Sequence, residues 1–123
     1  MLTKILVVDD EIDIATSIKE GLIKNGFEVD AYNEPQKALS DFKSNVYNLV
    51  LIDIRMPKMN GFELCREIKK KDDNAKICFI TAFEIYYDEF KKVFPTVNVS
   101  CFIRKPFSIN ELVLHIKSEL NIT

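Results

Sequence analysis

Short apolar runs alternate with amphipathic segments along the whole chain. The runs cover residues 4–8, 27–32, 48–52, 76–81 and 99–103, and the second is the weakest because polar residues interrupt it. Runs of this length that are apolar on both faces are typical of strands buried in a parallel sheet. The pattern therefore predicts an α/β fold, a doubly wound parallel sheet of five strands with helices on both faces and the second strand at an edge.

The segment that follows each run has apolar residues at helical spacing. The first predicted helix ends at Asn25, and the second begins with Asn33 as its cap and Pro35 in its first turn. The third is expected over 61–70, the fourth within 84–94, and the fifth near the C-terminus. The residues expected to face the core share this spacing and are Ile14, Ala15, Ile18, Leu22, Ala38, Leu39, Phe42, Phe62, Cys65, Ile68, Ile109, Leu112, Val113, Ile116 and Leu120.

Composition and charge exclude several classes of protein. The 123 residues suffice for one domain with its own core, and 17 basic against 19 acidic residues leave no basic patch, so no direct nucleic-acid binding is expected. No apolar run could span a membrane, and the N-terminus turns acidic too early for a secretory signal, which predicts a cytoplasmic protein. Cys65, Cys78 and Cys101 lack metal-ligand spacing and lie in apolar segments, so buried reduced thiols are expected.

Polar and charged residues gather where the predicted strands end. Asp9 and Asp10 follow the first strand, Asp53 ends the third, Thr81 ends the fourth, and Lys105 follows the fifth. Ligands of open parallel sheets bind outside the carboxyl ends of the strands. Four segments thus bring three carboxylates, a hydroxyl and an ammonium group to one edge of the sheet.

These groups suit Mg²⁺ and a phosphoryl group. Three neighbouring carboxylates repel one another unless a cation neutralises them, and oxygen ligands suit a hard divalent ion such as Mg²⁺. A carboxylate beside such an ion can attack phosphorus, because the metal and an ammonium group offset charge on the transferring phosphoryl group. Asp53, alone on its strand, is the predicted nucleophile, with Thr81 and Lys105 beside it.

Each motif also has a simpler interpretation. Asp9 and Asp10 could cap the first helix, Asp53 could be a turn residue, and Lys105 could be an ordinary surface lysine. Thr81 alone says almost nothing. A cap explains only one aspartate of the doublet, and the simpler interpretations need separate coincidences in four segments, which favours the phosphoacceptor interpretation.

Four motifs resemble the receiver domain of two-component response regulators, in particular the stand-alone chemotaxis type: VVDDE (7–11), LIDIRMPKMNG (51–61), ITA (80–82) and FIRKPF (102–107). The resemblance covers the whole chain, 1–123, so a single receiver domain without an output domain is expected. It implies a flavodoxin-like fold with strand order 2-1-3-4-5.

The resemblance also implies the ligands of the metal and the source of the phosphoryl group. Asp53 would take this group from a histidine kinase or phosphotransfer protein. Asp10, Asp53 and the backbone carbonyl of Arg55 would ligate Mg²⁺ directly, whereas Asp9 would act mainly through water. Thr81 would bond a phosphoryl oxygen and Lys105 would pair with the phosphoryl group.

Two further pairs of positions are expected to control the signal. Thr81 would move toward the phosphoryl group and Phe102 would turn into the vacated space, although the sequence leaves open that Phe102 is a plain core residue. Arg55 and Phe83 occupy the positions that tune the phosphate lifetime in the family. If they obstruct water the phosphoaspartate should last hours, and the sequence leaves open that Arg55 points into solvent.

The expected partners follow from the same resemblance. The surface of the fourth helix, fifth strand and fifth helix would bind a downstream output protein or a second copy of the chain. Consecutive Ile85, Tyr86 and Tyr87 are too many for one buried stripe, and Leu114 lies off the inward face of the last helix. His115 is interpreted as an ordinary helix residue.

The expected function is a switch that catalyses only its own phosphorylation and dephosphorylation and is not an enzyme for other substrates. Two other functions compete with it. A Mg²⁺-dependent phosphohydrolase of the haloacid dehalogenase type would carry an acid two residues after its nucleophile, but Arg55 stands there. A phosphorylation-independent scaffold would be attractive if Asp10, Asp53 or Lys105 were missing, and all three are present. The cognate kinase, stimulus and output are not encoded in any motif of this chain.

Overall fold

A computed structural model describes residues 2–82 and 101–122. The fourth predicted helix, within 84–94, lies outside the described residues, as do Phe83 and the apolar residues expected on that helix. Among the described residues, no helix is long and apolar enough to cross a membrane.

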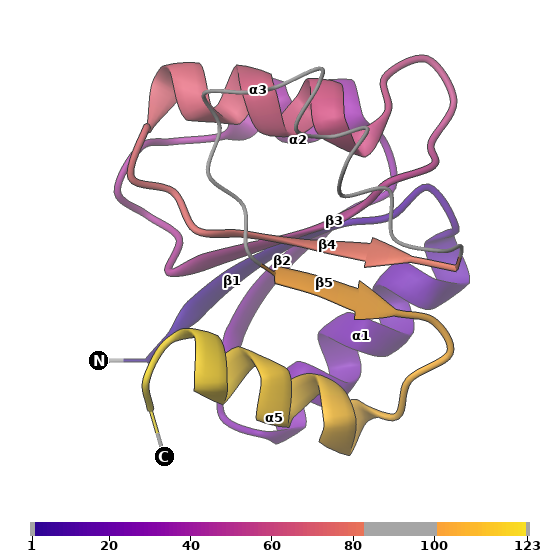
Figure 1. Ribbon diagram of the computed structural model, residues 1–123, viewed down its shortest axis with the longest axis vertical. Helices are drawn as coiled ribbons and strands as arrows, with labels where there is room; N and C mark the ends of the chain where they lie inside the picture. The colour runs from indigo at the N-terminus through magenta and orange to yellow at the C-terminus, as the bar shows by residue number, and fades with distance from the viewer. Residues whose placement is uncertain (1, 83–100, 123) are drawn as a thin grey trace.

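The described strands form one parallel sheet in the predicted order, β2-β1-β3-β4-β5 (Figure 1). All four neighbouring pairs run parallel, and β2 lies at an edge as expected. The strands are β1 (Lys4–Val8), β2 (Glu28–Tyr32), β3 (Leu49–Asp53), β4 (Ile77–Thr81) and β5 (Cys101–Arg104). The predicted flavodoxin-like arrangement is therefore confirmed.

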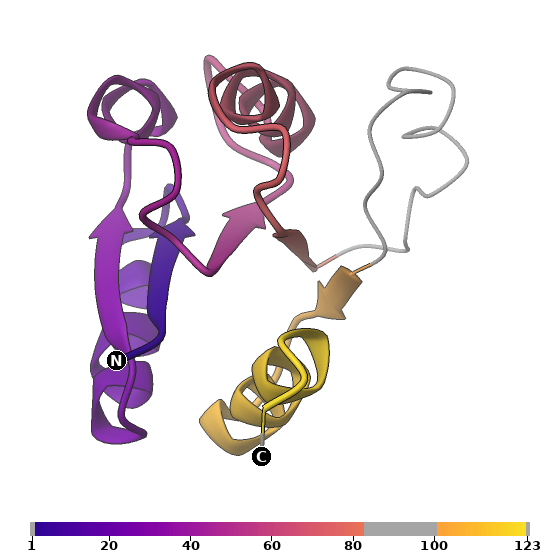
Figure 2. The same ribbon diagram turned by 90° about the vertical axis from the view of Figure 1, so that its left-hand side faces the viewer.

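Helices cover both faces of the sheet. They are α1 (Ile12–Lys24), α2 (Pro35–Asp41), α3 (Gly61–Lys71) and α5 (Ile109–Glu119). Figures 1 and 2 show α2 and α3 on one face and α1 with α5 on the other. The predicted end of the first helix at Asn25 and the predicted range 61–70 of the third agree with α1 and α3 to within one residue, because the apolar spacing that predicts a helix also forms its buried stripe.

The core has two parts, one on each face of the sheet. Alternate residues of a strand point to opposite faces, so Leu6 and Val8 pack with α2 and α3 whereas Ile5 and Val7 pack with α1 and α5. All four of these side chains are fully buried. Burial on both faces explains why the inner strands are continuously apolar in the sequence.

Helix starts are where the sequence predictions need correction. Asn33 does not cap α2; the cap position is Glu34, which makes no side-chain cap bond, and Pro35 occupies the first turn as expected. Two capping boxes were not predicted: the side chains of Asn60 and Ser108 accept bonds from backbone N–H groups at the starts of α3 and α5. Such bonds satisfy N–H groups that have no partner within the helix.

The cysteines also differ from the expectation. Cys78 and Cys101 form a disulfide, so the prediction of reduced thiols at these positions is wrong. They are register partners on adjacent strands, with Cα atoms 4.6 Å apart, a separation that a disulfide can bridge. Cys65 is a free, buried thiol as predicted, and burial raises its pKa to about 12.

Candidate functional site

The carboxyl ends of four strands bring the predicted site residues together. Asp53 and Thr81 are the last residues of β3 and β4, and Asp9 follows the last residue of β1. All three are buried, whereas Asp10 and Lys105 are half-buried. These positions explain the sequence pattern in which the polar site residues come directly at or after the ends of apolar strands.

The three carboxylates form a cluster that could hold a metal ion. One oxygen from each of Asp9, Asp10 and Asp53 lies within 4.8 Å of the others. Burial, and next the negative charge of Asp9, raise the pKa of Asp53 to about 7, although the charge of Lys105 lowers it. The protein therefore holds these carboxylates closer together than their charges favour, and a hard divalent cation suits the all-oxygen donor set.

Lys105 is the cation within this cluster. Its Nζ atom donates to Oδ2 of Asp9 at 2.9 Å and lies 3.8 Å from Oδ2 of Asp53. Burial acts to lower the pKa of Lys105, but the bond to Asp9 and the charges of Asp53, Asp9 and Glu11 outweigh it and raise that pKa. The ammonium group thus remains charged beside the carboxylate that the sequence singles out as nucleophile.

The interpretation of the doublet as a helix cap is wrong, because the cap position of α1 is Glu11, which makes no side-chain cap bond. The backbone N–H of Glu11, at the start of α1, donates to Oδ1 of Asp9 at 3.0 Å. The other oxygen of Asp9 takes the bond from Lys105. Asp9 is therefore fixed from two sides, and Glu11, which the sequence analysis overlooked, contributes both a backbone donor and a negative charge near Lys105.

The loop after β3 is anchored closely to the site. The backbone N–H of Ile54 donates to the carbonyl oxygen of Ile80 at 3.1 Å, and the N–H of Gly61 donates to the carbonyl oxygen of Ile54 at 2.8 Å. A Cβ atom on Gly61 would lie 2.5 Å from the carbonyl oxygen of Asp53, so only glycine fits without a shift. This contact explains the glycine that ends the motif after Asp53. Arg55, within the loop, is exposed.

The expected switch residue Phe102 is partly buried on β5. It is the register partner of Phe79 on β4, and the centroids of the two rings are 5.6 Å apart. On α5, Leu114 is 68% exposed, which agrees with its predicted position off the inward face. His115 is exposed on the same helix, as the sequence suggested.

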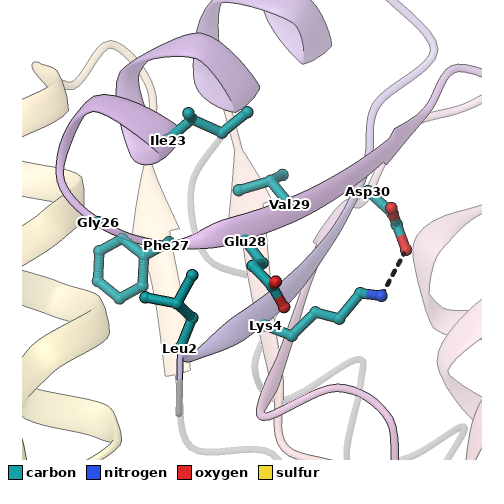
Figure 3. A pocket seen from close by; sticks show the side chains of 8 residues that line it. All are labelled: Leu2, Lys4, Ile23, Gly26, Phe27, Glu28, Val29 and Asp30. Atoms are coloured by element: carbon teal, nitrogen blue, oxygen red, sulfur yellow. Dashed lines mark ion pairs between the residues drawn. The ribbon is translucent and has the colours of Figure 1, made fainter.

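A separate hollow of about 490 Å³ lies at the opposite end of the sheet, along the edge strand β2. Figure 3 shows Leu2, Ile23 and Phe27 around it, with an ion pair of 3.5 Å between Lys4 and Asp30. It contains none of the predicted site residues. The acidic cluster at the carboxyl ends therefore remains the candidate functional site.

Comparisons with known proteins agree with this geometry. A family model described as response regulator receiver domain matches residues 5–117. Response regulator ArlR of Staphylococcus saprophyticus is 34% identical over 97% of this chain and 53% of its own length. The probable transcriptional regulator ycf27 of Cyanophora paradoxa is 36% identical over 98% of this chain and 49% of its own length. The chain thus spans about half the length of these curated relatives.

Solved structures are similar over nearly the whole chain. A CheY-like receiver domain protein from Methanospirillum hungatei has a TM-score of 0.86 at 29% identity, covering 98% of this chain and 95% of that chain. The response regulator TrrA of Thermotoga maritima, solved in complex with Mg²⁺ and BeF, has a TM-score of 0.81 at 35% identity, with coverage of 96% and 99%.

Proposed function

The chain belongs to the response regulator receiver domain family of two-component signalling, and we propose that it is a phosphorylation-activated switch whose phosphoacceptor is Asp53. The observation that carries this proposal is the cluster of Asp9, Asp10 and Asp53 with the Lys105 ammonium group 3.8 Å from Asp53. A buried carboxylate between further acids and one cation is arranged to react with a phosphoryl group rather than to stabilise the fold.

The proposed metal ion is Mg²⁺, which Asp10, Asp53 and the backbone carbonyl of Arg55 would hold directly, whereas Asp9 would act through water. The donor set fits, because Asp9, Asp10 and Asp53 bring three carboxylate oxygens within 4.8 Å of one another. Burial, and next the charge of Asp9, raise the pKa of Asp53, and a divalent ion would favour its charged form. When bound, Mg²⁺ supplies positive charge shared between the acceptor carboxylate and the oxygens of the phosphoryl group.

In the proposed transfer, an Oδ atom of Asp53 forms the new bond to phosphorus. The bond from phosphorus to the donor's imidazole nitrogen or acyl oxygen breaks, and its electron pair leaves with the donor. Lys105 offsets charge on the phosphoryl oxygens, exchanging part of its interaction with Asp9 for one with the phosphoryl group. The donor is proposed to be a histidine kinase or phosphotransfer protein.

The proposed response begins at Thr81, which is buried at the end of β4 and bonds a phosphoryl oxygen. Its backbone carbonyl accepts from the N–H of Lys105 at 2.7 Å, which joins β4 to the end of β5. A shift at Thr81 is therefore communicated to β5, where Phe102 packs against Phe79. The output surface is proposed to include β5 and α5, with the exposed Leu114 as a contact for an output protein or a second copy.

The competing functions have less support from the site. An exposed arginine, Arg55, stands where a phosphohydrolase of the haloacid dehalogenase type would need an acid. A scaffold that ignores phosphate would not require a buried carboxylate whose pKa is raised to about 7. We infer that the chain catalyses only its own phosphorylation and dephosphorylation. The relative from Cyanophora paradoxa is named a probable transcriptional regulator, which suggests control of transcription as an output of this receiver domain.

The test is labelling by a small acyl phosphate, followed by intact mass spectrometry. Wild-type protein with Mg²⁺ should gain one phosphoryl group, and chelation of the metal should abolish the gain. Asp53→Asn should remain unlabelled, whereas Asp73→Asn, which removes an exposed acid remote from the cluster, should label like wild type. Full labelling of Asp53→Asn, or labelling that does not depend on the metal, would refute the proposal.

A further inference from the structure

The disulfide between Cys78 and Cys101 joins the two strands that carry the proposed switch. Cys78 lies within β4 and is fully buried, and Cys101 is the first described residue of β5 and is 6% exposed. Both side chains point to the face of the sheet that α1 and α5 cover. The bond thus closes one end of the β4–β5 ladder.

The switch residues occupy the rest of this ladder. Its four register pairs begin with Cys78 and Cys101 and end with Thr81 and Arg104. Phe102 follows Cys101 directly and pairs with Phe79, on the opposite face of the sheet from the disulfide. Any movement of β5 that repositions Phe102 must therefore take place one residue from a covalent cross-link.

Because β5 lies at the edge of the described sheet, the disulfide restricts the movement of this strand more than it would restrict an inner strand. In the described part of the chain, β5 is an edge strand and pairs only with β4. An edge strand has backbone bonds on one side only, so it can shift at lower cost than an inner strand. A covalent bond to its one neighbour removes that freedom.

We propose that the Cys78–Cys101 disulfide is a reversible redox link that opposes the phosphorylation switch: the oxidised protein responds weakly to phosphate, and the reduced protein responds fully. The inference rests on the proposed function of Asp53. The link and the phosphate site are then two sites coupled through one ladder, and the free energy of coupling acts in both directions.

Both redox states are chemically accessible. One thiol of a dithiol reductant attacks a sulfur of the disulfide, which breaks the S–S bond, releases one protein thiol and forms a mixed disulfide. The second thiol of the reductant then displaces the other protein thiol, so that the reductant leaves as a disulfide. Hydrogen peroxide reverses this: one thiol is oxidised to a sulfenic acid while the peroxide loses one oxygen and leaves as water. The second thiol then attacks the sulfur of the sulfenic acid, which restores the S–S bond and releases a second water. Cys101 is the more exposed residue of the pair, at 6% against 0% for Cys78.

Glu119 lies beside the disulfide and could interact with the buried thiols of Cys78 and Cys101 after reduction. One of its carboxylate oxygens lies within 4.8 Å of both sulfur atoms. In the reduced protein this oxygen can accept a hydrogen bond from either thiol. The reduced cysteines would therefore have a hydrogen-bond acceptor close by in the core.

Cys65 provides a matched control within the same chain. It is fully buried, but it lies on the other face of the sheet, in α3, and forms no disulfide. The other two cysteines of the chain are joined to each other on the opposite face, so Cys65 has no cysteine beside it with which to form a disulfide. Cys65→Ala should keep the redox response, whereas a double variant with Cys78→Ala and Cys101→Ala should lose it.

The test first counts free thiols and then measures the response. After peroxide treatment, alkylation in denaturant should modify one cysteine per chain, and after treatment with dithiothreitol it should modify three. The apparent dissociation constant of beryllium fluoride with Mg²⁺ is then measured by NMR on oxidised and reduced full-length chain. Binding should be weaker in the oxidised protein by about fivefold or more, the lower end of typical coupling between sites.

The outcomes separate this inference from the proposed function. Equal affinity in the two redox states, or three alkylated cysteines after peroxide, overturns the redox link but leaves the phosphate site intact. No binding in either state overturns both. If the double alanine variant does not fold, the comparison of oxidised and reduced Cys65→Ala still decides, because this variant retains the pair. A double variant that still responds to peroxide would also refute the proposal.

Discussion

Replacing Asp53 by asparagine should stabilise the metal-free protein, and the gain should grow with pH. The pKa of Asp53 is raised from 3.8 to about 7, mainly by burial and then by the charge of Asp9. The folded protein therefore holds this proton more tightly than the unfolded chain, so stability is lost as the pH rises from the lower value through the higher one. At about 1.4 kcal/mol per pH unit, the loss is about 2 kcal/mol at pH 5 and about 4 kcal/mol at pH 8.

Urea unfolding followed by circular dichroism, in the presence of a chelator, measures this difference. Asp53→Asn cannot ionise, so its advantage over wild type should be about 2 kcal/mol at pH 5 and about 4 kcal/mol at pH 8. Asp73→Asn, at an exposed position, is the control and should show no such change with pH. Adding Mg²⁺ at pH 8 should narrow the gap, because the ion stabilises the wild-type carboxylate cluster.

A gain that is equal at both pH values, or larger at pH 5, would refute this reasoning. It would mean that ionisation of Asp53 does not destabilise the folded protein, because neighbouring groups already compensate the charge of its carboxylate. The cluster would then not be a site that awaits a cation, and the argument for metal binding from the raised pKa would fail.

Three further results are expected. Lys105→Met should cost about 3 kcal/mol in urea unfolding, because it leaves the buried carboxylate of Asp9 without its ammonium partner; no loss would show that the pair is weak. Gly61→Ala should cost about 2 kcal/mol and slow phosphorylation, because the new methyl group displaces the loop that supports the acceptor; unchanged stability would show that the loop adapts freely. Arg55→Asn combined with Phe83→Glu should shorten a phosphoaspartate lifetime of hours by about tenfold, equivalent to about 1.4 kcal/mol of barrier; the loss of acid-stable label after donor removal measures this, and wild-type decay within a minute would contradict it.

The strands and helices of this fold were predictable because their signals are local and strong. The inner strands are apolar on both faces, and the helices repeat their apolar residues at regular spacing, as Leu112, Val113 and Ile116 show on α5. The position of the site followed from one topological rule, that the carboxyl ends of parallel strands meet at one edge. Asp53 and Thr81 could be placed there from their position at strand ends alone.

What the sequence could not show depends on register and on contacts distant in the chain. The disulfide needs Cys78 and Cys101 to be direct neighbours across two strands, and apolar periodicity does not give the register of one strand against another. The bond from Lys105 to Asp9 joins residues 96 apart in the chain. Glu11 was overlooked because its contribution to the site includes a backbone N–H group, which no residue type signals.

The most direct test of the account is to identify the phosphorylated residue chemically. The protein is treated with a small acyl phosphate and Mg²⁺ and then reduced with borohydride, which converts an aspartyl phosphate to homoserine, and the product is mapped by peptide mass spectrometry. The account predicts homoserine at position 53, only with phosphodonor and Mg²⁺ together. Homoserine at Asp9 or Asp10 instead, or none at any position in protein that carries a phosphoryl group, would contradict it.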